Sequence, residues 1–159
     1  TAGRTMMGMT SSDMVAMVEG LPNPPIAFGA NCGVGASDLL RTVLGFAAQG
    51  TERPIIAKGN AGIPRFEDGH IHYDGTPELM AEYARLARDA GARIIGGCCG
   101  TMPEHLRAMR AALETHTPRA RPTLDQIAEV LGGFSSPSDG TGSDDGAAPR
   151  RARRGRRRA

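Results

Sequence analysis

Three short apolar segments, each followed by a loop and a helical pattern, constrain the fold of this chain more than any other feature. They are residues 26–29, 54–58 and 92–96, and none shows a strict alternation of apolar and polar side chains. Unbroken apolar runs of this length are typical of strands buried on both faces. A strand, a loop and a helix repeated three times predict parallel βα units. Such units build either an open doubly wound sheet or a closed eight-stranded barrel.

The helices of these units have clear start signals. Ser37 or Asp38 is predicted to cap the first, in which apolar residues recur at helical spacing. Thr76 followed by Pro77 opens the second, because threonine caps well and proline suits the first turn. Pro103 opens the third in the same way. Two further helices are expected, one after Ser11 or Ser12 and one over residues 123–131.

The three cysteines of the chain all lie in loops that follow predicted strands. Cys32 follows the first strand, and Cys98 and Cys99 follow the third. Loops at the carboxyl ends of parallel strands converge, so three thiols can meet on one zinc ion and leave its fourth position open. Two other interpretations stay open. A disulfide between the adjacent pair would be strained and would leave the third thiol alone. Free cysteines also pack as small hydrophobic side chains.

The neighbours of the cysteines have two interpretations each. Asn31 either orients its loop or touches a substrate, although asparagine also forms turns. Gly97 lets the backbone approach an ion or an amino acid closely, or lets a strand pack against a helix. By contrast, His70 and His72 lie in a stretch, residues 59–75, that is expected to be a polar loop. We therefore expect these histidines to be solvated rather than to bind a metal.

Three motifs occupy the loops at this edge. They are Asn-Cys-Gly at residues 31–33, Gly-Asn-Ala-Gly-Ile-Pro at 59–64 and Gly-Gly-Cys-Cys-Gly at 96–100. In this order and separation they resemble the homocysteine S-methyltransferase family, which includes betaine-homocysteine methyltransferases and the homocysteine-binding module of cobalamin-dependent methionine synthase. The resemblance runs to about Leu113 and implies a (β/α)8 TIM barrel with a zinc held by three cysteines. The implied zinc ligands are Cys32, Cys98 and Cys99, with Asn31 and Gly97 as candidates for substrate contact.

The implied activity is zinc-dependent methyl transfer to the thiol of homocysteine, which gives methionine. The methyl donor is expected to be betaine or a related small molecule, because the chain ends in a polar tail rather than in folate or cobalamin modules. One alternative is the homocysteine-binding module of a methionine synthase. Another, of a different class, is a non-catalytic protein that binds nucleic acid through its tail. Thiolate metal chemistry favours a reducing cytoplasm, and no run of about 18 apolar residues predicts a membrane span.

The length of the chain bears on its domain organisation. A (β/α)8 barrel needs about 200 residues or more, and this sequence has 159. Residues 1–116 are therefore expected to form the carboxyl-terminal half of such a barrel, and residues 117–131 a short helical extension. Unpaired strands then predict a partner, either the amino-terminal half or another copy. The chain alone is expected to be inactive.

A polar tail over residues 132–159 is expected to be disordered. It is rich in glycine, serine and aspartate and then in arginine, with seven arginines between residues 150 and 158. A basic run can bind phosphates, but no aromatic side chain lies among these arginines. Nucleic acid is therefore not expected to be the main partner.

Overall fold

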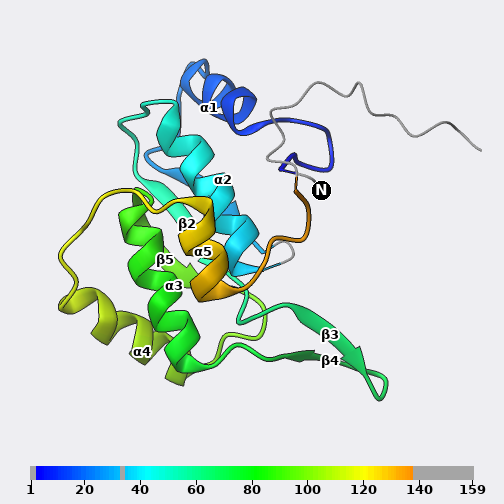
Figure 1. The fold of residues 1–159 in the computed structure, drawn as a ribbon. Helices are drawn as coiled ribbons and strands as arrows, with labels where there is room; N and C mark the ends of the chain where they lie inside the picture. Colours follow the sequence, from blue (N-terminus) through cyan, green and yellow to red (C-terminus); the bar gives the residue numbers. More distant parts are fainter. Residues whose placement is uncertain (1–2, 33–34, 138–159) are drawn as a thin grey trace, which may run out of the picture.

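The structure is a computed structural model, and it describes residues 3–32 and 35–137. Within them the predicted alternation of strands and helices is confirmed (Figure 1). Strands β1 (Phe28–Asn31), β2 (Ile55–Gly59) and β5 (Ala92–Gly97) form a parallel sheet in the order β1-β2-β5. The helices that follow these strands are α2 (Ala36–Ala48), α3 (Pro77–Asp89) and α4 (Pro103–Glu114).

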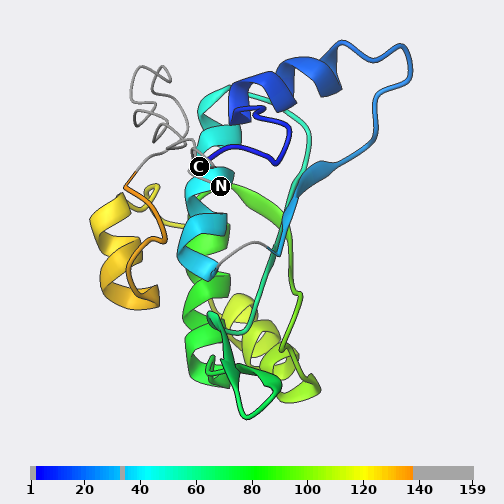
Figure 2. The ribbon, with the colours of Figure 1, turned by 90° about the vertical axis from the view of Figure 1, so that its right-hand side faces the viewer.

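The parallel sheet is covered on one face and open on the other. Figure 2 shows α2 and α3 on the same side of the strands. On the opposite face the register places Asn31, Lys58 and Gly96 in one row, in which the asparagine and the lysine are exposed. Ile94, two residues before Gly96 on the same face, is 47% exposed. The described residues thus form a mixed α/β structure with a parallel sheet, and they contain no closed barrel.

The core lies between the sheet and these helices. Leu40 and Val43 of α2 and Met80 and Tyr83 of α3 are fully buried, because helical spacing places each pair on one face. The Tyr83 hydroxyl accepts a hydrogen bond from the Gly59 N–H at 2.9 Å. Burial raises the pKa of this phenol, so it stays protonated. This contact joins α3 to the end of β2.

Replacing Tyr83 by phenylalanine is expected to lower the free energy of unfolding by about 1 to 3 kcal/mol. The ring would stay in the core, but the buried Gly59 N–H would lose its acceptor. Urea unfolding of the two proteins measures the difference. Equal stability would mean that the Gly59 amide does not depend on this hydroxyl.

The stretch expected to be a polar loop holds an antiparallel hairpin, which corrects that prediction. Strands β3 (Pro64–Glu67) and β4 (His70–Tyr73) are joined by Asp68 and Gly69, whose φ angles are 49° and 81°. An Asp-Gly pair is strongly preferred in two-residue hairpin turns, because both positions need positive φ. The signal was therefore present in the sequence.

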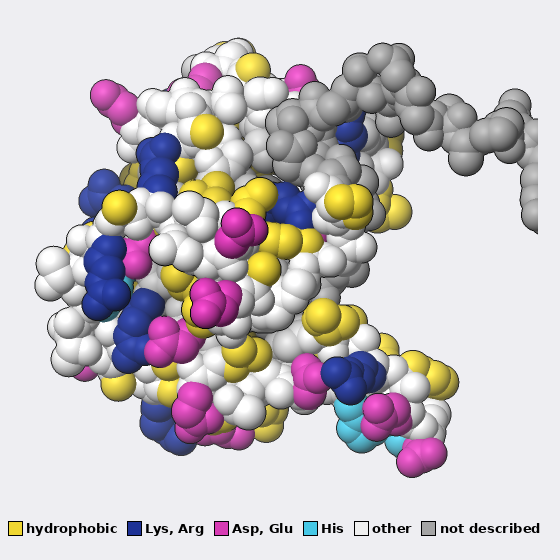
Figure 3. Space-filling view, viewed as in Figure 1, with side chains coloured by type: hydrophobic (Ala, Val, Ile, Leu, Met, Phe, Trp, Pro, Cys, Tyr) yellow, Lys and Arg dark blue, Asp and Glu magenta, His cyan; other side chains and the backbone are white. Residues whose placement is uncertain are grey.

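The hairpin projects from the body of the molecule (Figures 1 and 3). Phe66 and Ile71 are paired across it and are 76% and 63% exposed. His70 and His72 are exposed on β4, as expected for solvated side chains. The group of described residues that could hold a metal ion contains neither histidine.

Two helices outside the βα units have clear N-terminal caps. Helix α1 (Ser11–Glu19) begins after Thr10, so neither following serine is the cap. The Thr10 hydroxyl accepts the Asp13 N–H at 3.2 Å, and the Asp13 carboxylate accepts the Thr10 N–H at 2.8 Å. Helix α5 (Leu124–Leu131), predicted as an amphipathic helix, is confirmed and is capped in the same way by Thr123.

The start of α2 differs from the prediction. Its cap position is Gly35, so Ser37 and Asp38 lie inside the first turn. Both side chains bind the segment that follows α5. The Ser37 hydroxyl donates to the Gly132 carbonyl at 2.6 Å, and the Asp38 carboxylate accepts the Ser135 N–H at 3.0 Å.

The first residues of the expected tail are packed rather than free. The Arg41 guanidinium lies 3.9 Å from the centre of the Phe134 ring and donates to the Ser136 carbonyl at 2.8 Å. Residues 132–137 therefore belong to the folded part of the chain. Residues 138–159, with the arginine run, lie outside the described residues. Among the helices that the structure describes, none has the length and apolar character needed to cross a membrane.

Candidate metal centre

The three cysteines follow two strands that end at the same edge of the sheet. Cys32 comes directly after β1 and adopts a φ of 61°, while Cys98 and Cys99 come directly after β5. Backbone hydrogen bonds extend the ladder past the strands. The Cys32 N–H donates to the Lys58 carbonyl at 3.0 Å, and the Cys98 N–H donates to the Gly59 carbonyl at 2.7 Å. Strand β2, between the other two, thus holds both cysteine loops in place.

The sulfur atoms of these cysteines meet. The Sγ atoms of Cys32 and Cys99 are 3.2 Å apart, those of Cys98 and Cys32 are 3.3 Å apart, and those of Cys98 and Cys99 are 3.9 Å apart. A disulfide needs about 2.05 Å, and all three thiols are free. None is buried, so they do not pack as small hydrophobic side chains either. The geometry shows a cluster of three thiols that could hold a metal ion.

The donor set fits a tetrahedral metal ion that prefers sulfur. Zinc-to-sulfur bonds of about 2.3 Å at tetrahedral angles separate the sulfur atoms by about 3.8 Å. The separations here, 3.2 to 3.9 Å, need only a small expansion to reach that value. Three thiolates would occupy three positions of such an ion and leave one for another ligand.

Residues 1–113 match the family model described as homocysteine S-methyltransferase. The chain belongs to the homocysteine S-methyltransferase family. The match includes all three cysteines and the two strands that precede them, and it ends in α4. Helix α5 and residues 132–137, which follow it, lie beyond the matched residues.

Hydrogen bonds within the cluster shift the pKa values of Cys32 and Cys98 in opposite directions. Hydrogen bonds with Cys99 and Cys98 are the main reason why the pKa of Cys32 is raised to about 11. The pKa of Cys98 is lowered, chiefly because it is hydrogen-bonded to Cys32 and also because the Asn31 amide lies near. Without a cation, a thiolate at Cys98 opposes the ionisation of Cys32, because like charges repel. A bound cation would remove that opposition.

The two predicted neighbours of the cysteines have different surroundings. The Asn31 side-chain amide lies 3.9 Å from the Cys98 sulfur, so it is part of the thiol cluster's environment. At Gly97 an added Cβ would lie 2.2 Å from the Thr101 hydroxyl, so this glycine is needed for the packing of the following loop. The Thr101 Oγ1 atom is buried and has no hydrogen-bond partner among the described residues. Substrate contact by Asn31 or Gly97 stays a prediction.

Asn60 and Tyr73 add two polar contacts to the site. Asn60 was expected near the site without a role; it is 2% exposed, and its side-chain oxygen accepts the Cys99 N–H at 3.1 Å. Tyr73, the last residue of β4, was not predicted to lie at the site. Its phenol lies beside the Cys99 thiol, and partial desolvation followed by the interaction with this thiol raises the pKa of the phenol. Gly100, with a φ of 73°, makes room for the Tyr73 ring.

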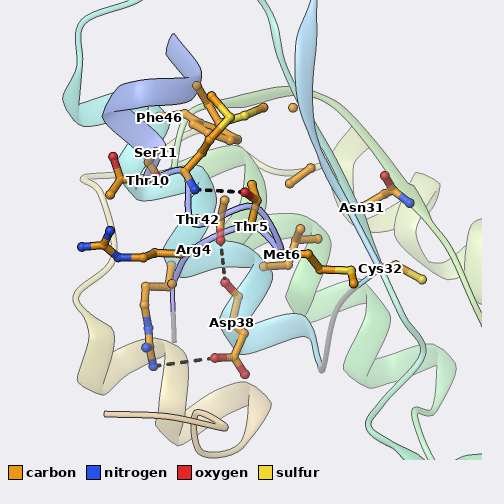
Figure 4. Close-up of a pocket in the computed structure, with 17 residues that line it drawn as sticks. Arg4, Thr5, Met6, Thr10, Ser11, Asn31, Cys32, Asp38, Thr42 and Phe46 are labelled. Carbon is orange, nitrogen blue, oxygen red and sulfur yellow. Dashed lines mark hydrogen bonds and ion pairs between the residues drawn. The ribbon is translucent and has the colours of Figure 1, made fainter. Parts of the chain in front are cut away.

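A cavity of about 470 Å³ borders the thiol cluster. Figure 4 shows Asn31 and Cys32 at one end and Arg4 and Thr10 at the other. Its lining combines apolar side chains, among them Phe46 of α2, with polar and charged ones such as Asp38 and Arg41. Cavities of this size and character are typical of small-molecule sites.

Proposed function

We propose that this chain is the metal-binding part of a homocysteine S-methyltransferase, and that it uses zinc to transfer a methyl group to the homocysteine thiol. The observation that carries the proposal is the convergence of three cysteine sulfurs, all within 4.8 Å of one another, at one end of a parallel sheet. Three thiolates in tetrahedral arrangement select zinc over harder ions such as magnesium or calcium. The family membership supports the same chemistry.

The residues of the chain have distinct roles in this proposal. Cys32, Cys98 and Cys99 hold the ion as thiolates. Bound zinc would act as a Lewis acid and lower the pKa of a substrate thiol, so that this thiol ionises near neutral pH. Three thiolates carry more negative charge than a divalent ion neutralises, so hydrogen bonds to them are stabilising. Asn31 and Tyr73 lie where they can donate such bonds to Cys98 and Cys99.

The proposed substrates are homocysteine and a small methyl donor, most simply betaine, and the product is methionine. The neighbouring cavity supports this because its volume suits an amino acid or a donor of that size. We propose a reducing, cytoplasmic setting because the three thiols must stay free to bind a metal.

The open sheet face supports a proposal about the whole fold. Strands β1 and β5 are the two edges of the sheet, and Ile94 is exposed on the uncovered face. Unpaired parallel edges and an uncovered apolar side chain are unfavourable in water. We propose that further strands, from an amino-terminal half or a second copy, complete a (β/α)8 barrel around this face.

Binding of homocysteine to the cobalt-loaded chain tests the function directly. Cobalt(II) takes the place of zinc in thiolate sites and reports ligand changes by its visible absorption. We expect homocysteine to change that spectrum and homoserine, which has oxygen in place of sulfur, to leave it unchanged. Cobalt-loaded chain that does not respond to homocysteine would contradict the proposed substrate. Methionine formation from labelled betaine, S-methylmethionine or a methylcorrinoid, by this chain combined with the strands that complete the barrel, then identifies the donor.

Metal affinity is expected to rise with pH across the neutral range. The contacts that raise the pKa of Cys32 to about 11 keep this thiol protonated below that pH, so it must release its proton when a metal binds. For each proton released on metal binding, log K for the metal rises by roughly one unit per pH unit. Competition with a chromophoric chelator between about pH 6 and pH 8 measures this slope, after correction for the chelator. An affinity independent of pH would contradict thiolate ligation.

A further inference from the structure

We propose that His105 is a positioning residue of the metal centre, which holds the base of the β3–β4 hairpin against the cysteine loop. This inference rests on the proposed metal-binding function. His105 lies in the first turn of α4, is 7% exposed, and was not singled out by its sequence context. Its two ring nitrogens contact the backbones of two segments that are far apart in the sequence.

The two contacts determine the tautomer of the ring. The Met102 N–H lies 2.9 Å from Nδ1 and can only donate, so Nδ1 has no proton. The Nε2 atom lies 2.9 Å from the Gly75 carbonyl oxygen, which can only accept, so Nε2 carries the proton. The imidazole is therefore neutral, with its single proton directed at the loop that follows the hairpin.

A continuous series of hydrogen bonds leads from this ring to Cys99. The Gly75 N–H donates to the Ala61 carbonyl at 3.0 Å, and the Ala61 N–H donates to the Cys99 carbonyl at 2.9 Å. The Cys99 N–H in turn donates to the Asn60 side chain at 3.1 Å. His105, on α4, contacts the Gly75 end of this series. The loops after β2, β4 and β5 are therefore joined to one another and to α4.

The backbones at this junction lie too close together for a side chain at Gly62 or Gly75. An added Cβ at Gly75 would lie 2.3 Å from the Ala61 carbonyl carbon, and one at Gly62 would lie 2.6 Å from the Gly75 nitrogen. Tyr73 is two residues before Gly75, and its ring lies against Gly100. Holding Gly75 therefore also restricts the position of the Tyr73 ring against the cysteine loop. Outer contacts of this kind orient metal ligands in many proteins.

Three substitutions of His105 distinguish its role as a helix cap from its hydrogen bond to the Gly75 carbonyl. His105→Gln keeps both functions, because its oxygen can accept the Met102 N–H and its amide can donate to Gly75. His105→Glu keeps the cap and favours the helix start, but it has no donor for the Gly75 carbonyl. His105→Leu has neither group. A purely structural cap would make the glutamate variant equal to wild type.

The test compares zinc affinity, by chelator competition, in the full 159-residue chain and its variants. We expect about 10- to 100-fold weaker binding for His105→Glu and His105→Leu, and recovery toward the wild-type value for His105→Gln. Wild-type affinity in the glutamate variant would overturn the inference. If the wild-type chain itself binds no zinc, the proposed function fails, and the inference is decided by the metal-free measurements below.

Two measurements on the metal-free chain keep the inference separately testable. Nitrogen NMR of the imidazole should show a protonated Nε2 and an unprotonated Nδ1. Amide hydrogen exchange at Ala61 and Gly75 should be slow in wild type and His105→Gln, and at least about tenfold faster in His105→Glu if the link is lost. The opposite tautomer, or equal exchange in the glutamate variant, would overturn the role of His105.

Discussion

Serine in place of Cys98 is expected to reduce zinc affinity by roughly 100- to 1000-fold. Thiolate zinc sites bind with about 10 to 16 kcal/mol at neutral pH. Sharing that free energy among three or four ligands assigns about 2.5 to 5 kcal/mol to each, with a middle value of about 3.5 kcal/mol, and every 1.4 kcal/mol is a factor of ten. Elemental analysis after purification under reducing conditions, followed by chelator competition, measures the loss. Serine at Cys32 or Cys99 should act alike, because all three sulfurs belong to one cluster.

His72→Ala is the matched control for these substitutions. His72 is a potential metal ligand of the same chain, but it is exposed on the hairpin and lies outside the thiol cluster. Its removal should leave the zinc content unchanged. Loss of zinc in this variant, together with retention of zinc in the serine variants, would refute the three-thiolate centre.

Alanine in place of Gly29 is expected to destabilise the chain by about 3 kcal/mol or more, the upper end of the range for an overpacked core. An added Cβ at this position would lie 1.9 Å from the Ile56 carbonyl oxygen and 2.6 Å from its carbonyl carbon. Backbone cannot move aside as a flexible side chain does, so β1 and β2 would have to separate. Because Cys32 directly follows β1, zinc affinity should fall with stability.

The control for this substitution is Gly133→Ala, where an added Cβ meets nothing within 4 Å. Urea unfolding of both variants should show a lower midpoint for Gly29→Ala and a small change for the control. A Gly29→Ala chain with wild-type stability would mean that the two strands lie farther apart than the structure places them.

Much of the site was predictable because its chemistry lies in short local motifs. Parallel strands end at a common edge, so finding Cys32 after one strand and Cys98 and Cys99 after another was enough to predict that they meet. Local signals also predicted the cap at Thr76, which depends on only a few neighbouring residues. The hairpin was missed although its Asp-Gly turn was visible.

The remaining contacts depend on residues that are distant in the sequence. Tyr73 reaches Cys99 only because the hairpin folds back, and His105 reaches Gly75 across 30 residues. Ser37 binds Gly132 across 95 residues instead of capping its own helix. No periodicity or motif marks such pairs, since each partner taken alone is an ordinary polar residue.

The sequence by itself therefore determined the parallel βα units and the convergence of three thiols, because periodicity and strand direction follow from local chemistry. Only the tertiary structure decided which groups surround those thiols. It brings Asn60, Tyr73 and His105 to the cysteine loop through buried backbone groups that must find partners. Those partners are chosen by the packing of whole elements, which no local segment encodes.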